Sequence, residues 1–251
     1  PCGEPYHQLV RGQLEREDSP APTEKVAFQA CHVTGGEVHD LSFSVRAGGC
    51  VVLQDLNNQI FGDLLELLTG KLPLEQGSFE LEGTPFVPGY TREMAILLEH
   101  AHESMLLKEM SVLDNLCFTL DHRLPEVWRS NRLRRGIEQE CRELLDPELF
   151  SLWPDQLTTP QKYDLIYTRV LLQKPKVIFC VQPFQGADME LRMRIWNHLE
   201  RLLEQGAALV ILAVNLADSL SLAHQLIRIH RGGPHECYSR EDFSRLSDTT
   251  P

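Results

Sequence analysis

The sequence predicts an α/β fold with a mostly parallel sheet core, because buried strands alternate with helices along the chain. Three runs are apolar without interruption: Cys50–Leu53, Val177–Val181 and Leu209–Val214. A continuous apolar run is typical of a strand buried on both faces, whereas a strand with one wet face alternates. The amphipathic segment Leu191–Glu204 lies between the last two runs. It predicts the helical crossover that two parallel strands need.

The other expected elements are shorter or less regular. From about residue 104 to residue 156 the pattern is helical, and Pro147 and Pro154 mark its end. This block predicts a helical subdomain over about residues 104–172. The remaining elements are strands at Val26–Cys31, Leu41–Val45, Ser78–Glu82 and Leu226–Ile229, a helix at Asp63–Leu68, and a helix from Thr158 to about Leu172.

Composition excludes some classes of function. The net charge of −12 argues against a nucleic-acid-binding protein, which needs a basic face. Arg132, Arg134 and Arg135 form one small basic group, which we interpret as a solvated helix end. The seven cysteines form no CxxC pair and indicate reduced thiols in a cytoplasmic protein. The sequence has no run of about twenty apolar residues, so we expect no direct membrane insertion.

The domain boundaries follow from changes in composition. Residues 1–24 are polar and contain prolines, which predicts a linker or tail. The folded domain is expected over residues 25–233, and residues 234–251 are expected to form a C-terminal tail. The chain begins at a proline and carries no signal peptide, so we expect it to be a fragment of something longer.

Several stretches carry a family resemblance when taken together and in order. They are Asp40–Gly48, Leu65–Gly77, Met110–Leu116, Lys174–Phe179 leading to Pro183 and Gly186–Asp188, and Leu222–Gly232. In this order they resemble the nucleotide-binding domain of ATP-binding cassette (ABC) transporters, closest to the C-terminal cassette of tandem sugar-importer ATPases of the ribose/galactose type. The resemblance covers about residues 25–233. It implies a P-loop-NTPase-like cassette with an antiparallel β subdomain and a helical subdomain beside the parallel core.

The family's phosphate loop reads G-x-x-x-x-G-K-[ST], because glycines let backbone N–H groups surround the phosphates and the lysine neutralises their charge. The matching segment here is Asp55–Gly62, in which the loop glycines are replaced. The lysine position holds phenylalanine, and the position of the magnesium-binding hydroxyl holds glycine. Lys71 lies beyond the next helix and cannot substitute. The degenerate positions are Asn57, Asn58, Phe61, Gly62 and Asp63.

Two carboxylates, Asp55 and Asp63, lie at this loop. A carboxylate about 5 Å from a phosphate charge costs about 3 kcal/mol at an effective dielectric constant of about 20. We interpret Asp63 as a cap that accepts the free N–H groups at the helix start and complements the helix dipole. We therefore expect the protein's own carboxylate to fill the anion site.

The family's other catalytic positions are also replaced. The strand Val177–Val181 should end in a magnesium-binding aspartate followed by a water-activating glutamate, but these positions hold Val181 and Gln182. Valine cannot ligate a hard cation, and glutamine cannot act as a base. The family's switch histidine would fall at Val214, so we expect no catalytic side chain at any of the three positions.

The signature loop L-S-G-G-Q corresponds to Leu157–Gln161 in this sequence. Pro160 has no N–H to offer to a γ-phosphate, and its ring crowds the approach. We expect this segment to start a helix, with a threonine cap followed by proline at the first helical position. Thr158 keeps a hydroxyl, which leaves one weak polar contact open.

Four polar residues near the other family motifs remain. His100 and His102 form an H-x-H pair without an evident third ligand, so we interpret them as surface histidines and expect no metal. Glu99 matches a glutamate that sugar-importer cassettes often carry, which implies a loop facing a membrane partner. The resemblance gives Asp188 a role in contact between cassettes.

We predict a degenerate, pseudo-ATPase cassette with a structural or regulatory role in a carbohydrate-import-like system. Its expected partner is another cassette, fused N-terminally or separate, or a membrane permease, and it would lie in the cytoplasm, at the inner face of the cell membrane when bound. We expect no cofactor and no enzymatic activity. Two alternatives stay open: a sugar-importer subunit that still binds or hydrolyses ATP with Mg²⁺, and a signalling or ligand-sensing domain on the same fold.

Overall fold

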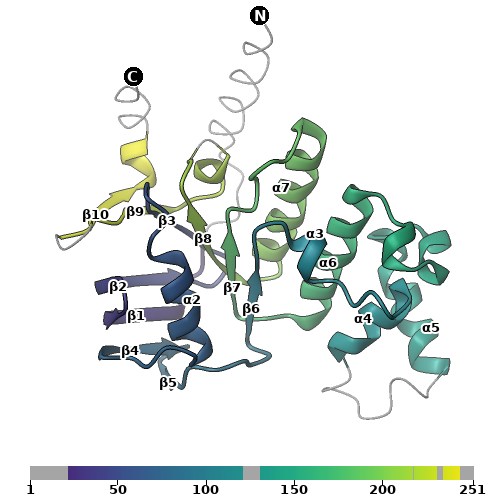
Figure 1. Ribbon diagram of the computed structural model, residues 1–251, viewed down its shortest axis with the longest axis horizontal. Coiled ribbons are helices and arrows are strands. Elements are labelled where there is room, and N and C mark those ends of the chain that lie inside the picture. The colour runs from purple at the N-terminus through teal and green to yellow at the C-terminus, as the bar shows by residue number, and fades with distance from the viewer. Residues whose placement is uncertain (1–21, 121–130, 217, 231–233, 244–251) are drawn as a thin grey trace, which may run out of the picture. The chain divides into compact units, whose positions relative to one another are not determined.

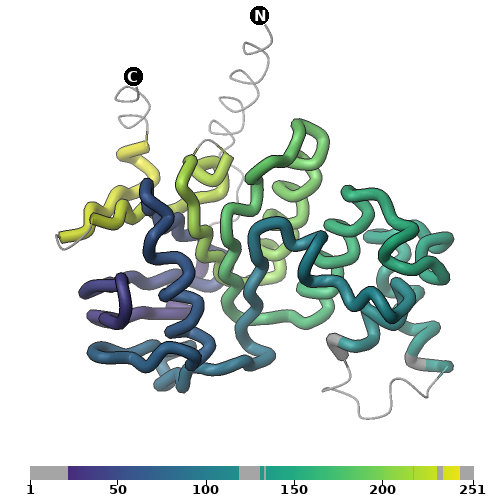
Figure 2. Tube along the Cα trace, viewed as in Figure 1, coloured from purple at the N-terminus to yellow at the C-terminus, as the bar shows by residue number. Residues whose placement is uncertain are grey.

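The computed structural model describes residues 22–120, 131–216, 218–230 and 234–243. Most of the predicted linker (1–24) and part of the predicted C-terminal tail lie outside these ranges. The described residues include no helix that combines the length and the apolar character needed to cross a membrane. The chain divides into two compact units, one from residues 1–97, 176–184 and 200–251 and the other from residues 98–175 and 185–199. Figure 2 traces the course of the chain through both.

The first unit contains a six-stranded sheet in the order β10-β9-β3-β8-β7-β6 (Figure 1). All its pairs are parallel except the antiparallel pair of β10 and β9. Every residue of β3, β7 and β8 is buried, which confirms the parallel core predicted from the apolar runs. The strands are β3 (Cys50–Gln54), β6 (Met94–Leu97), β7 (Val177–Val181), β8 (Ala208–Ala213), β9 (Gln225–Arg228) and β10 (Glu236–Ser239).

A second sheet in the same unit is antiparallel, with the order β2-β1-β4-β5. Its strands are β1 (Val26–Gly35), β2 (Val38–Arg46), β4 (Gln76–Leu81) and β5 (Thr84–Phe86). Phe28 of β1 is fully buried, and its ring meets Phe179 of β7 edge-on with the ring centroids 5.4 Å apart. The two sheets therefore share one core, into which α2 (Phe61–Thr69) places Phe61, Leu64, Leu67 and Leu68.

The second unit is helical. It contains α3 (Ala101–Ser104), α4 (Val112–Leu120), α5 (Asn131–Glu140), α6 (Thr159–Gln173), most of α7 (Met189–Glu204) and the 3-10 turns Cys141–Glu143, Pro147–Ser151 and Pro154–Gln156. Asn115 on α4 is fully buried, and its side-chain amide donates to the backbone oxygens of Leu107, Met110 and Ser111. This amide fixes the loop that precedes α4, and its hydrogen bonds meet the requirement of a buried polar group for partners.

Three strands were not predicted: β5, β6 and β10. Each is three or four residues long, too short for a period-2 pattern to stand out. The expected boundary at residue 233 needs correction, because β10 lies in the segment predicted to be a C-terminal tail and pairs with β9 from Glu236 to Ser239. The chain also forms 3-10 turns at Ser219–Ser221 and Arg240–Asp242.

Gly77 offers a test of the junction between β1 and β4. Its φ is +86°, and a Cβ there would lie 2.3 Å from the backbone oxygen of His32. Gly77→Ala should lower the free energy of unfolding by about 3 kcal/mol, from a positive φ and a backbone clash. Gly83→Ala is the matched control, because its φ is +75° but a Cβ would meet open space among the described residues. Urea unfolding followed by circular dichroism measures both, and equal losses would contradict the clash.

His224 makes the stability of the first unit depend on pH. Its Nδ1 accepts a hydrogen bond from the N–H of Cys50 at 3.1 Å. Burial, and then the charge of Arg240, lower the pKa of His224 below its ordinary value of 6.5. Below pH 6.5 the unfolded chain therefore binds a proton that the folded chain does not, so stability is lost as pH falls from 6.5 toward the folded pKa.

His224→Gln should therefore flatten the fall in the urea midpoint between about pH 7.5 and about pH 5. The exposed His39 supplies the control, as His39→Gln. An unchanged pH profile in His224→Gln would show that other groups set the acid sensitivity.

Candidate functional site at the phosphate-loop position

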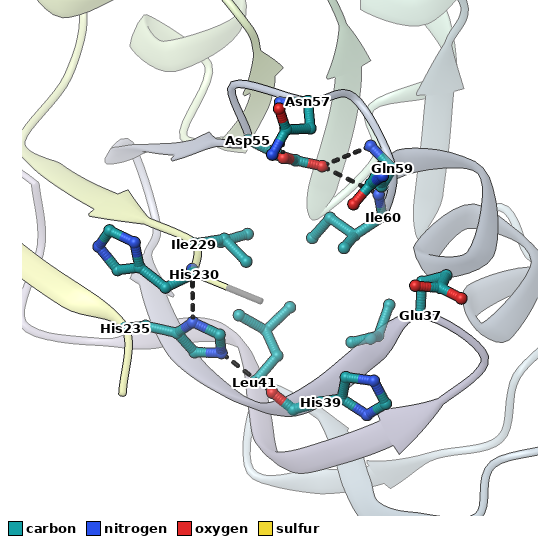
Figure 3. A pocket seen from close by; sticks show the side chains of 11 residues that line it. Glu37, His39, Leu41, Asp55, Asn57, Gln59, Ile60, Ile229, His230 and His235 are labelled. Atoms are coloured by element: carbon teal, nitrogen blue, oxygen red, sulfur yellow. Dashed lines mark hydrogen bonds between the residues drawn. The ribbon is translucent and has the colours of Figure 1, made fainter. Parts of the chain in front are cut away.

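The loop between β3 and α2 is built around the side chain of Asp55. This carboxylate is only 5% exposed. Its Oδ1 accepts a hydrogen bond from the N–H of Asn57 at 3.0 Å. Its Oδ2 accepts from the N–H of Gln59 at 2.6 Å and of Ile60 at 3.0 Å (Figure 3). One carboxylate therefore satisfies three backbone N–H donors of the loop at the point where the parallel strand β3 ends.

The arrangement has the electrostatics of an occupied anion site. Backbone N–H groups that converge in a turn before a helix attract negative charge, and the helix dipole adds to the attraction. Hydrogen bonds to an ionised acceptor are about twice as strong as neutral ones. Here the negative charge comes from the loop itself. The carboxylate that accepts from this loop is that of Asp55, not that of Asp63 as predicted from the sequence.

The capping role predicted for Asp63 is wrong, although its charge lies in the first turn, where it complements the helix dipole as predicted. The helix begins at Phe61, with Asp63 inside its first turn, so Asp63 is not the cap. Its Oδ2 accepts instead from the N–H of Glu37, at 2.7 Å, in the turn between β1 and β2. Gly36 permits this approach, because a Cβ there would lie 2.2 Å from Asp63 Oδ2 and the φ of Gly36 is +58°. Asp55 accepts the N–H groups before the helix, and Asp63 joins the helix to the β1–β2 turn.

The two positions that matter most for phosphate charge hold non-ionic residues. Phe61, at the family's lysine position, is 2% exposed and packs in the core of the first unit. Gly62, at the family's hydroxyl position, is exposed. Asn58 lies in the loop with a φ of +52°, and its N–H donates to the backbone oxygen of Asp55 at 3.2 Å. The residues of the loop thus supply hydrogen bonds to one another and no positive charge.

The strand ends beside the loop are closed by hydrogen bonds between protein groups. Val181 is buried, and the N–H of Gln182, whose φ is +43°, donates to Leu212 O at 2.8 Å. The backbone oxygen of Val214 accepts from Gln54 Nε2 at 3.3 Å. Gln54 Oε1 in turn accepts from Arg228 Nε at 3.0 Å. These contacts give the three positions structural roles at the carboxyl ends of β7 and β8.

In the second unit, the segment at the signature position caps a helix. Thr158 is the N-cap of α6 and forms a capping box with Gln161. Gln161 Oε1 accepts from the N–H of Thr158 at 2.9 Å. Proline lies in the first turn, where helices tolerate it, but one residue later than predicted, because Thr159 is the first helical residue. The hydroxyl of Thr158 is occupied by the cap.

The remaining polar candidates also lie in the second unit. His102 Nδ1 lies 3.2 Å from the hydroxyl of Tyr163, and burial lowers the pKa of His102. His100 Nε2 lies 3.5 Å from Glu99 Oε1. The described residues contain no group of three or more side chains that could hold a metal ion. Asp188 Oδ1 accepts from the N–H of Leu191 at 2.9 Å, at the start of α7.

A cavity beside the loop brings in residues that the sequence reasoning missed. It is lined by the β1–β2 segment, by the loop from Asp55 to Ile60, and by residues around His230 and His235 (Figure 3). His235 Nε2 donates to the backbone oxygen of His39 at 3.0 Å. No motif pointed to His235, because its position depends on the hairpin of β9 and β10, which was not predicted.

The lysine position can be tested directly. Phe61→Lys would bury an unpaired ammonium group in the core and should cost about 3 kcal/mol or more of stability. Phe61→Met is the control, since a swap of similar volume should cost less than about 1.5 kcal/mol. Urea unfolding gives both values. A lysine variant as stable as the methionine variant would show that the side chain at position 61 reaches solvent.

No protein-family model matches the chain. Among curated proteins, it is 23% identical over 207 residues to the ribose import ATP-binding protein RbsA of Geobacillus kaustophilus, covering 78% of this chain and 42% of that protein. It is 22% identical over 262 residues to RbsA of Bacillus licheniformis, covering 96% and 52%. It is 25% identical over 202 residues to the Fe(3+) ions import ATP-binding protein FbpC of Pseudomonas fluorescens, covering 78% and 55%. The chain thus spans about half the length of the curated relatives it matches.

Solved structures that resemble this chain also come from ABC transporters. An ATP-binding cassette of an ABC transporter in its ADP conformation matches with a TM-score of 0.71 and 19% identity, over 89% of this chain and 96% of that one. A component of the ABC transporter complex cbiONQ from Clostridium perfringens matches with a TM-score of 0.73 and 14% identity, over 90% and 93%. The chain therefore has the fold of an ABC nucleotide-binding domain, and the resemblance drawn from its sequence is confirmed.

Proposed function

We propose that the chain is a degenerate, pseudo-ATPase cassette with a structural or regulatory role. The observation that carries the proposal is the carboxylate of Asp55, which accepts from three backbone amides at the phosphate-loop position. A triphosphate that used the same donors would have to displace this carboxylate. It would also find Phe61, rather than a lysine, at the position that neutralises phosphate charge.

Catalysis would meet a separate obstacle. Phosphoryl transfer depends on positioning and on neutralising the charge of the transferred group. The loss of one electrostatic element can cost about a thousandfold in rate. In this chain the positions of the metal-binding acid and the base hold Val181 and Gln182. Activity through the family's mechanism is therefore not expected from this cassette alone.

The system and partners are proposed from the relatives. Two of those compared above are named as ribose import proteins and one as an iron import protein. On that basis we place the chain in a carbohydrate-import-like system, paired with another cassette or a membrane permease. In that role it would lie in the cytoplasm and attach peripherally to the inner face of the cell membrane.

A second candidate function is an importer subunit that still binds or hydrolyses ATP with Mg²⁺. The names of the relatives favour it, since each is called an ATP-binding protein. It requires the nucleotide to compete with Asp55 or to bind through groups outside the loop. Binding of Mg-ATP therefore separates the two candidates. The third alternative, a signalling or ligand-sensing domain, stays a prediction.

We expect millimolar Mg-ATP to leave the melting temperature of the purified chain unchanged. A ligand at about 100 times its dissociation constant adds about 2.7 kcal/mol, and each kcal/mol raises the melting temperature of a chain of this length by about 2–4 °C. Thermal denaturation with calorimetric titration is the measurement, with FbpC as a positive control. A rise of about 5 °C or more would support the second candidate.

Hydrolysis gives an independent check of the same proposal. Only trace phosphate release is expected from the purified chain. Turnover above that level, abolished by Gln182→Ala or Asp63→Ala, would overturn the pseudo-ATPase proposal.

A further inference from the structure

Two carboxylates hold the region around the cavity together. Asp55 accepts from the N–H groups of Asn57, Gln59 and Ile60 within the loop. Asp63, at the start of α2, accepts from the N–H of Glu37 in the β1–β2 turn. Both contacts lie within the first unit. The loop, the helix start and the turn are thus fixed to one another by charge-assisted hydrogen bonds, the stronger class of such bonds.

The same segments line one cavity. Residues 37–41 of the β1–β2 segment form one wall, and residues 55–60 of the loop form another (Figure 3). A ligand in this cavity would touch both walls. In an ordinary binding site the ligand supplies the contacts that order such walls, and the protein loses conformational entropy on binding. Here aspartate side chains already supply such contacts.

We propose that Asp55 and Asp63 act as a built-in substitute for a ligand, which keeps the loop and the β1–β2 turn in one conformation whether or not nucleotide is present. The inference rests on the proposed function and adds a regulatory property to it. A ligand changes a conformation only through its differential affinity for two states. A region already held by its own carboxylates offers one state, so a partner would meet a surface that does not respond to nucleotide.

Burial and the number of N–H donors make Asp55 the stronger of the two contacts. Its carboxylate is 5% exposed, whereas Asp63 is half-buried. The four residues Leu56 to Gln59 are exposed and contribute little packing of their own. The order of the loop therefore depends on the hydrogen bonds of Asp55. Removing that carboxylate should release the loop while the buried strands stay folded.

Hydrogen exchange of the ligand-free chain, measured by mass spectrometry, tests whether Asp55 holds the loop in one conformation. The amides of Asn57, Gln59 and Ile60, which donate to the Asp55 carboxylate, should be protected in the natural sequence. In Asp55→Ala they should exchange about tenfold to a hundredfold faster, since a bond to a charged acceptor is lost at each. Glu24→Ala is the control, an exposed carboxylate of the same unit outside the walls of the cavity. It should leave loop exchange unchanged.

Chemical rescue adds a second readout. Sodium acetate should restore protection to the loop of Asp55→Ala, because free carboxylate can occupy the space left by the side chain. Sodium chloride at the same ionic strength should not. If Asp55→Ala does not fold, Asp55→Asn keeps the shape, replaces one acceptor oxygen by a donor and should release part of the loop. Asp63→Ala should increase exchange at Glu37.

Loop amides of the natural sequence that exchange as fast as an unstructured peptide would overturn the inference. So would an Asp55→Ala loop as protected as that of the natural sequence. The outcome is distinct from that of the nucleotide test. A protected loop in a chain that binds Mg-ATP would sink the pseudo-ATPase proposal alone, whereas an unprotected loop in a chain that ignores Mg-ATP would sink only this inference.

Discussion

The burial of β3, β8 and β7 on both faces is the constraint on which the first unit depends. All sixteen residues of these strands, Cys50–Gln54, Val177–Val181 and Ala208–Ala213, are buried. A charge introduced there would lie in the core without a partner. The residues that follow the strands at their carboxyl ends face no such limit, and ligands of α/β proteins bind at those ends. A chain can therefore keep the cassette fold while every position that handles phosphate changes.

A loop at this position needs hydrogen-bond acceptors for its backbone N–H groups whatever its sequence. Orphan N–H groups before a helix need an acceptor, from a ligand, water or a side chain. Asp55 meets this need with one buried side chain, while Phe61 packs in the core of the first unit. In the proposed pseudo-ATPase, Asp55 and Phe61 would make this loop a structural one.

The sequence predicted what depends on strong periodic or apolar patterns. The buried strands and the helices α2, α6 and α7 followed from runs and spacing. Short edge strands such as β10 were not predicted, because pairing with a neighbouring strand, rather than an alternating apolar pattern in the sequence, makes them strands. The capping carboxylate was misassigned for a related reason. Asp63 lies inside the first turn of the helix, whereas the loop folds back so that Asp55 reaches the amides before it.

The loop geometry also limits how an ATP-binding function could operate here. Displacing Asp55 forfeits three hydrogen bonds to a charged acceptor, each worth about 1.5–3 kcal/mol. The phosphates would recover part of that loss but would meet the displaced carboxylate at a cost of about 3 kcal/mol at about 5 Å. No lysine at position 61 offsets this. Nucleotide affinity would therefore have to come from contacts to the base and ribose, and a cassette that binds this way would not discriminate between ATP and adenosine.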